Sequence, residues 1–200
     1  MTTGDLSFAT IGWMAIASGI ACILAIVLLI LFFTVGQPFG TLNDIFNGIT
    51  GISILILAWM LYAEHHAKSP LLSQLALVTA IIGAIVVVIG SILVIFQITG
   101  WVLAGLYTGA GNALLGLWLA SFCYSMLRGN IFPHNLVVFG LVVGACMALG
   151  LFLIPGIFAR IDSMESPPWY LYLGFLEYLG VYILYPIWAI WLGRQLLSSH

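Results

Sequence analysis

A single acidic residue, Glu177, lies inside the apolar segment that runs from residue 169 to residue 193. If this segment crosses a membrane as a helix, the carboxyl group lies roughly 12 Å along the helix axis. That depth is near the middle of a hydrocarbon core about 30 Å thick. An ionisable group there is costly and normally faces a partner or a cavity inside the protein. Glu177 is therefore the first candidate for a binding site.

The fourth apolar segment holds a row of small residues with one amide among them. The row has spacings of four, three and four residues, which place its members on one helix face: Gly105, Gly109, Asn112 and Gly116. Gly140 and Gly144 form a similar row in the fifth segment. Small residues let membrane helices approach closely, so we expect these faces to be helix contacts.

Glu177 has glycines three residues away on both sides, Gly174 and Gly180, and should also face a close helix contact. Asn112 and Glu177 should lie at similar depths, because they fall at similar distances into their segments. We expect a hydrogen bond between them, or a small polar cavity that holds both. Three further side chains could lie near this site: Ser53, Tyr107 and Tyr178.

Two interpretations of Glu177 remain open. In the first, the acid only joins helices through hydrogen bonds, which stabilise membrane proteins by about 0.6 kcal/mol on average. In the second, it binds a proton or a cation, or contacts a lipophilic ligand. Ionisable residues inside membrane segments are functional candidates by default. A single acid without a second ionisable partner is, however, an incomplete proton relay.

Asp44 follows Thr41 by three residues in the connection after the first apolar segment. The simpler interpretation is a capping box, in which the two side chains satisfy free amide groups at a helix N-terminus. The alternative is a mouth that attracts cations, formed by Asn43, Asp44 and Asn47.

Residues for catalysis are not grouped at membrane depth, where the sequence offers no paired carboxylates, no Ser–His–Asp set and no Cys–His pair. The histidines belong near one membrane surface, so we do not expect a haem with two histidine ligands inside the bundle. We interpret them as part of solvated helix ends; the alternative is a surface metal site of His65, His66 and His134. We therefore expect no enzyme activity, no cofactor and no bound metal.

The amino-acid composition indicates that most of the protein surface contacts lipid and not water. Its 200 residues are 64% hydrophobic and only 5% charged, whereas soluble domains have about 25% charged residues. Six apolar segments are long enough to span a bilayer, near residues 10–35, 45–63, 75–96, 103–126, 135–158 and 169–193. We predict an all-α polytopic membrane protein with one domain over residues 1–200, folded as a bundle of six transmembrane helices.

The few basic residues indicate the orientation. Lys68, Arg128 and Arg194 fall on one side of the membrane, and Arg160, which could pair with Asp162, falls on the other. Because cytoplasmic loops are enriched in Lys and Arg, we expect both termini in the cytoplasm. Four basic residues cannot form a phosphate-binding surface. The expected partners are membrane lipid and other membrane subunits or further copies of the chain, and not nucleic acid.

Two stretches are distinctive: GNALLGLWLASFCYSML at 111–127 and YPIWAIWLGRQLL at 185–197. In both, the chain resembles small bacterial six-span membrane proteins that form a family of unknown function. The resemblance implies a location in the bacterial inner membrane and a bundle of six helices. It implies no catalytic residue.

The near absence of loops and charges favours a non-enzymatic structural or accessory subunit of a membrane assembly. The alternative is a small carrier or channel for a proton, a cation or a lipophilic ligand, which would use Glu177 and Asn112. Pro155 and Pro186 fall late in the fifth and sixth segments and have no counterparts in the first three. This asymmetry counts against a transporter built from inverted repeats.

Overall fold

The computed structural model describes residues 3–65, 70–127 and 131–198. In these ranges the chain is helical apart from its connections, and none of the described residues forms a β-strand. Six helical segments are long and apolar enough to cross a membrane. The predicted all-α bundle of six helices is confirmed, and the chain is a multi-pass membrane protein.

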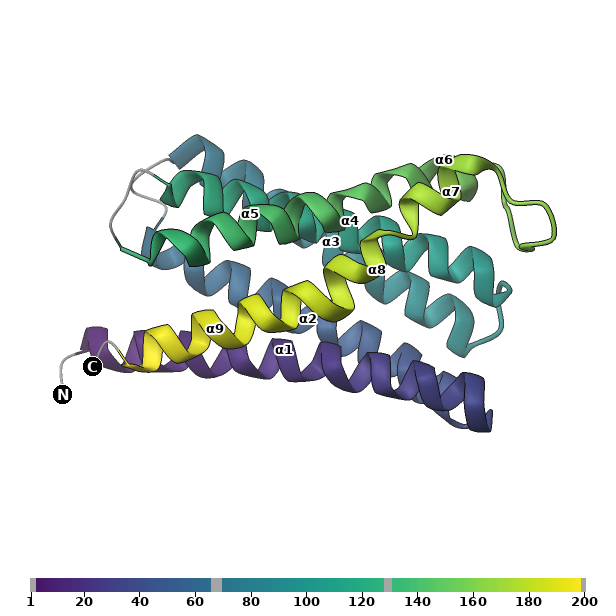
Figure 1. Cartoon of the computed structure of the whole chain (residues 1–200), viewed down its shortest axis with the longest axis horizontal. Coiled ribbons are helices and arrows are strands. Elements are labelled where there is room, and N and C mark those ends of the chain that lie inside the picture. Colours follow the sequence, from purple (N-terminus) through teal and green to yellow (C-terminus); the bar gives the residue numbers. More distant parts are fainter. Residues whose placement is uncertain (1–2, 66–69, 128–130, 199–200) are drawn as a thin grey trace.

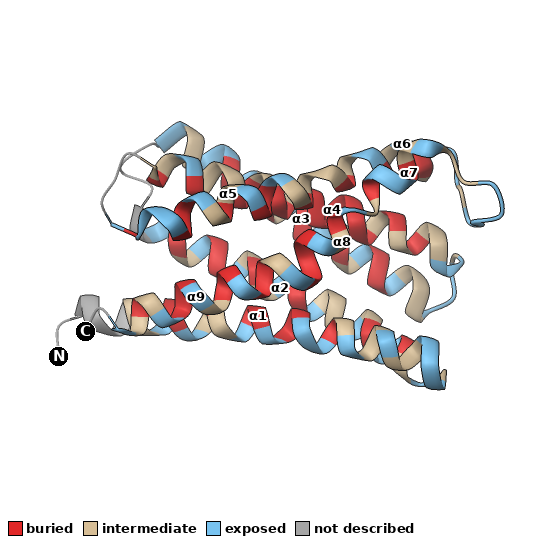
Figure 2. Ribbon diagram, in the orientation of Figure 1, coloured by how far each residue is buried: buried red, intermediate tan, exposed pale blue. Residues whose placement is uncertain are grey.

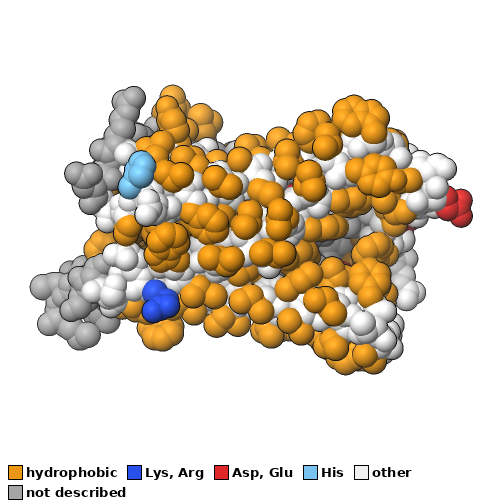
Figure 3. Space-filling view, viewed as in Figure 1, with side chains coloured by type: hydrophobic (Ala, Val, Ile, Leu, Met, Phe, Trp, Pro, Cys, Tyr) orange, Lys and Arg blue, Asp and Glu red, His pale blue; other side chains and the backbone are white. Residues whose placement is uncertain are grey.

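The first four spans are continuous helices. They are α1 (Thr3–Val35), α2 (Phe39–His65), α3 (Pro70–Ile95) and α4 (Trp101–Met126). α2 and α3 begin several residues before the predicted segments 45–63 and 75–96, because residues that we assigned to the connections are already helical. The outer surface is dominated by hydrophobic side chains (Figure 3), as a lipid environment requires.

The fifth and sixth spans are interrupted. The fifth consists of α5 (His134–Ala148), the 3₁₀-helical η2 (Leu149–Leu153) and α6 (Ile154–Phe158). The sixth consists of α7 (Trp169–Gly174), α8 (Glu177–Leu179), the π-helical η3 (Gly180–Leu184) and α9 (Tyr185–Ser198).

A proline follows each irregular segment. Pro155 is in the first turn of α6, directly after η2, and Pro186 is in the first turn of α9, directly after η3. Because proline has no backbone N–H, it cannot make the usual bond to the carbonyl four residues earlier. The preceding turns adopt 3₁₀ and π bonding instead; the N–H of Tyr185, for example, reaches the carbonyl of Gly180.

Each span packs against the next, and the sixth returns to the first (Figure 1). The sixth span crosses the bundle diagonally: α7 packs against η2, whereas α9 packs against α1. α4 is the most buried span (Figure 2) and contacts α3, α5, η2, α6 and α8. We call the end where α1 begins and α9 ends the near end, and the opposite end, with the connections 36–38, 96–100 and 159–168, the far end.

Glycines bring three helix pairs into backbone contact. The pairs are Gly83 with Gly111, Gly116 with Gly144, and Gly12 with Gly193, which join α3 to α4, α4 to α5, and α1 to α9. A Cβ atom at Gly83 would lie only 2.8 Å from the carbonyl oxygen of Gly111. Small residues thus supply the packing that drives helix association in lipid.

Three of the glycines singled out in the sequence surround the irregular parts of spans five and six. Gly109 of α4 and Gly174 of α7 both face the side chain of Leu153 in η2. A Cβ atom at Gly180 would lie 2.8 Å from the backbone nitrogen of Met147 in α5. A larger side chain at any of them would separate neighbouring helices.

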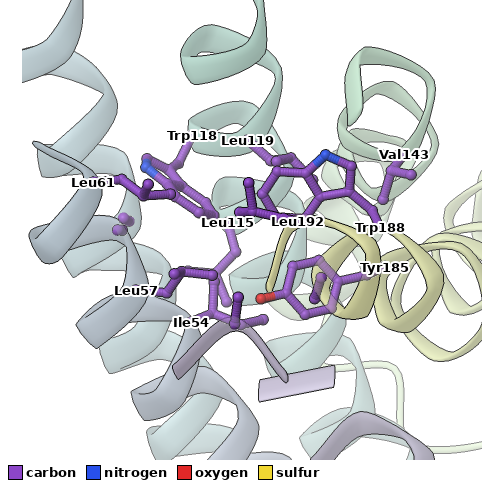
Figure 4. Close-up of a cluster of buried hydrophobic side chains, with 14 of the residues drawn as sticks. Ile54, Leu57, Leu61, Leu115, Trp118, Leu119, Val143, Tyr185, Trp188 and Leu192 are labelled. Carbon is purple, nitrogen blue, oxygen red and sulfur yellow. The ribbon is translucent and has the colours of Figure 1, made fainter. Parts of the chain in front are cut away.

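The near half of the bundle is filled by large side chains. Ile54, Leu57 and Leu61 of α2 meet Leu115, Trp118 and Leu119 of α4 and residues of α9 in one buried cluster (Figure 4). From α9 come Tyr185, Trp188 and Leu192, and Gly140 of α5 leaves room for the Trp188 indole. The buried side chains of this cluster are almost entirely apolar.

The N-terminal caps differ from those predicted. α2 begins at Phe39, so Thr41 lies inside its first turn, and its backbone N–H donates to the side-chain oxygen of Gln37 at 3.3 Å. The predicted Thr41–Asp44 capping box is therefore wrong. Asp162, which could have paired with Arg160, instead caps α4. It accepts hydrogen bonds from the backbone N–H groups of Gly100, at 2.7 Å, and Leu103, at 3.0 Å.

Asp162→Ala should destabilise the protein by about 1 kcal/mol, because it removes the acceptor for two free amides at the start of α4. Thermal unfolding in a fixed detergent would measure the loss. Glu165→Ala is the control, since Glu165 is exposed in the same connection and its side chain makes no such cap. Equal unfolding midpoints for the two variants would contradict the capping role.

Candidate functional site

Glu177 is completely buried at the start of α8, in the interrupted region of span six. Its side chain faces α4 and η2 and not the lipid. A Cβ atom at Gly109 would lie 3.0 Å from its Oε1, and one at Gly150 would lie 3.2 Å from its Cγ. Two glycines on two helices thus make the space that the acid occupies.

The carboxyl group of Glu177 has no hydrogen-bond partner for either oxygen among the residues that the structure describes. Asn112 lies close enough to interact with it, but the geometry falls short of a hydrogen bond. The structure therefore brings the two predicted residues together without forming the bond that we expected. An orphaned carboxyl group at this depth has a substantial energetic cost.

A cavity of about 210 Å³ lies beside this region, in the far half of the bundle. Its polar lining comes from α2, α4, α8 and η3: Asn43, Asp44, Asn47, Thr108, Tyr178 and Tyr182. In Figure 3 the surface is hollowed here, between the part formed by α7 and α8 and the far end of α1. This is not the polar cavity predicted from the sequence, because neither Glu177 nor Asn112 lines it; of the residues expected near that site, only Tyr178 does.

A chain of hydrogen bonds fixes one wall of the cavity. The Tyr182 hydroxyl donates to Oδ1 of Asn47 at 2.8 Å. The Asn47 amide donates to Oδ1 of Asn43 at 3.2 Å, and the Asn43 amide donates to the carbonyl of Ala25 at 2.7 Å. These bonds tie the π-helical segment of span six to α2 and α1, so the two asparagine side chains are held in place.

Aromatic rings form the other walls. Phe33 of α1 and Trp101 of α4 meet edge to face, with ring centroids 5.9 Å apart. The rings of Tyr178 and Tyr182 are 5.7 Å apart, and Tyr178 also stacks on Phe175 at 5.6 Å. The cavity is therefore lined by aromatic side chains, Phe33, Trp101, Tyr178 and Tyr182, beside its polar wall.

A second, more apolar cavity of about 190 Å³ adjoins the first. The two share Trp101, Gly105 and Tyr178 in their linings, and Met164 and Phe175 extend the second toward span six. Gly105 is the loosest of the glycines singled out in the sequence, because a Cβ atom there would lie 3.6 Å from the Tyr178 hydroxyl.

Asp44 is the only acidic side chain among the described residues that line the first cavity, and no described Lys, Arg or His lines it. Tyr178, which lines the cavity, directly follows the sealed acid Glu177 in the chain.

The remaining sequence candidates have different places. Ser53 and Tyr107 are half-buried on α2 and α4 and line neither cavity. Tyr182 and Thr108 were not anticipated. Asn43 and Asn47 belong to the alternative interpretation of this segment, and their spacing of four residues, which places them on one helix face, is a signal that could have singled them out.

A wide groove of about 670 Å³ between α1 and α9 is open and lined largely by Ile23, Ile187, Ile190 and Trp191, as expected for a surface that contacts lipid. His66 and the side chain of His65 lie outside the described residues. Among the described residues, no three His, Cys, Asp or Glu side chains lie close enough to hold a metal ion.

No protein-family model, curated protein or solved structure matches the chain. The resemblance to small bacterial six-span proteins therefore stays a prediction, and the function has to be inferred from the geometry of the site.

Proposed function

We propose that this membrane protein is a carrier of small cations and that the cavity around Asp44 is its binding site. The observation that supports this function is a carboxyl group in the wall of a cavity of about 210 Å³ whose lining, over the part of the chain that the structure describes, contains no basic side chain. An acid in such a place attracts a cation, and acids inside membrane bundles mark ion and substrate pathways.

The position of the cavity supports a carrier more than a channel. The cavity occupies the far half, whereas large side chains fill the near half (Figure 4). A carrier that is open to one side at a time has this asymmetry in each of its end states. The interrupted sixth span beside the cavity is also typical of transporters, whose discontinuous helices form binding sites near the middle of the membrane.

Glu177 would couple cation movement to protons. A carboxyl group sealed from water without a partner is too costly to keep charged, so Glu177 should hold a proton in the conformation that the structure shows. Tyr178 lines the cavity and is the next residue in the chain, so any movement of Glu177 also moves a wall of the cavity. Movement of span six that opens Glu177 to water would release its proton and alter the charge felt in the cavity.

The predicted orientation gives the carrier a direction. With both termini in the cytoplasm, the far end and its cavity would face outward, which is the periplasm in a bacterial inner membrane. The sequence favoured a role as an accessory subunit. The apolar outer surface does not distinguish that role from a carrier, because such a surface can contact lipid as well as a partner protein.

Asp44→Asn should weaken cation binding at least tenfold, which corresponds to about 1.4 kcal/mol, because it removes the charge and keeps the side-chain shape. Calorimetric titration of the protein in lipid nanodiscs would measure binding, with sodium, potassium, magnesium and tetramethylammonium chlorides as ligands. Uptake into proteoliposomes, with a pH-sensitive dye inside, would measure transport and its coupling to protons.

Glu165→Gln is the matched control, since it removes an acid at the same end of the bundle but outside the cavity. It should bind cations as the unchanged protein does. If no cation binds to the unchanged protein, or if Asp44→Asn binds with undiminished affinity, the proposed function is wrong.

A further inference from the structure

We infer that the preferred ligand of this cavity is an organic ammonium ion with an apolar body, and not a bare metal ion; this inference rests on the proposed cation site. Three properties of the site support it: the kind of oxygen ligands in the lining, the aromatic rings around the cavity, and the apolar cavity beside it.

The oxygen atoms in the lining are poorly suited to a metal ion. Ca²⁺ takes about six to eight oxygen ligands, carboxylates among them, but Asp44 offers the only carboxyl group among the described residues of the lining. Oδ1 of Asn47 already accepts a bond from Tyr182, and Oδ1 of Asn43 accepts one from Asn47. An ammonium ion needs only a counter-charge and few acceptors, and the lining supplies both.

Aromatic rings supply what a bulky cation requires. Phe33, Trp101, Tyr178 and Tyr182 all line the cavity. Cations are attracted to ring faces within about 6 Å of the centroid, and Leu29 and Val94 complete an apolar wall for the carbon groups of the ligand. The volume of about 210 Å³ far exceeds that of a bare ion, since one water molecule in the liquid takes about 30 Å³.

A second cavity lies beside the site and shares Trp101, Gly105 and Tyr178 with its lining. This apolar space of about 190 Å³ is lined further by Val102, Met164 and Phe175. A ligand with its ammonium group near Asp44 could place a hydrophobic substituent there. The two cavities together therefore favour ammonium ions that carry one larger apolar group.

The first experiment compares affinities in lipid nanodiscs by calorimetric titration. Tetramethylammonium should bind at least tenfold more tightly than sodium, potassium or magnesium, and benzyltrimethylammonium should bind more tightly still. Trp101→Leu should weaken both ammonium ions by roughly 2- to 30-fold, the range of cation–π interactions. Trp13→Leu is the control, because Trp13 is exposed on α1 and lies outside the lining.

The second experiment tests whether the ligand uses both cavities. Gly105→Val would add a branched side chain to the wall that they share, so benzyltrimethylammonium should lose at least tenfold in affinity while tetramethylammonium loses less than threefold. Gly105→Ala is the control for this substitution. It should fold and bind both ligands normally, because its Cβ would make only an ordinary contact with the Tyr178 hydroxyl, at 3.6 Å.

The outcomes separate the two proposals. If metal ions bind in an Asp44-dependent manner and ammonium ions do not, the ligand class is wrong while the cation carrier stands. If the Trp101→Leu variant binds both ammonium ions with full affinity, the aromatic recognition is wrong. If no cation of either class binds, both proposals are wrong.

Discussion

Replacing Glu177 by methionine should make the protein more stable and at the same time abolish proton-coupled transport. Both carboxyl oxygens are buried and have no hydrogen-bond partner among the described residues. Leaving a buried polar group unsatisfied costs about 1–3 kcal/mol, and methionine has a similar length without this cost. We therefore expect a gain of that size in the free energy of unfolding, measured in a fixed detergent.

The control for this substitution is Glu177→Gln, which keeps the shape and two polar atoms and should not share the gain in stability. The pair decides between the two interpretations of the acid left open by the sequence. If Glu177→Met lowers the unfolding midpoint, the carboxyl group joins helices through hydrogen bonds. If the midpoint rises and coupled uptake continues unchanged, Glu177 has no role in coupling.

Gly144→Ala should destabilise the protein by about 1–3 kcal/mol, the usual cost of overpacking. Its Cβ would lie 2.6 Å from the backbone nitrogen of Ala120 and 2.7 Å from the carbonyl oxygen of Gly116. Because these are backbone atoms, no side-chain rotation relieves the contact, and α4 and α5 would have to separate. The unfolding midpoint and the fraction of monodisperse protein after detergent extraction would both fall.

Gly48→Ala is the matched control, because it is the same substitution in a helix and its Cβ would lie 3.5 Å from the Ser91 hydroxyl oxygen. The gain in helix propensity is up to about 1 kcal/mol at either position, so Gly48→Ala should be neutral or slightly stabilising. Equal behaviour of the two variants would show that the α4–α5 contact is not limiting for stability.

The sequence predicts the six spans because apolar length is a strong and local signal. The interruptions of spans five and six are not visible in that signal. Pro155 and Pro186 indicate where helical bonding is lost, but the 3₁₀ and π geometry of η2 and η3 depends on neighbouring helices, such as the contact between Gly180 and Met147. Hydropathy carries no information about such contacts.

The site was predicted in part. The burial of Glu177 follows from its glycine neighbours, and its proximity to Asn112 follows from their equal depths. The cavity around Asp44 depends on Tyr182 reaching Asn47 from another span, which no local pattern encodes. The start of α2 was ambiguous for another reason. A capping box and a cation-attracting mouth both use acidic and other small polar residues, so residue type alone does not separate them.

The diagonal course of the sixth span has a consequence for biogenesis. The ribosome makes this helix after the other five, yet α9 packs against α1, the first of the six, and η3 supplies a wall of the cavity. Until residues 169–198 enter the bilayer, the Gly12 face of α1 lacks its packing partner, and the Gly109 face of α4 has Leu153 but not Glu177 beside it. The bundle of six helices is therefore incomplete until this helix inserts, and the binding site cannot form before then.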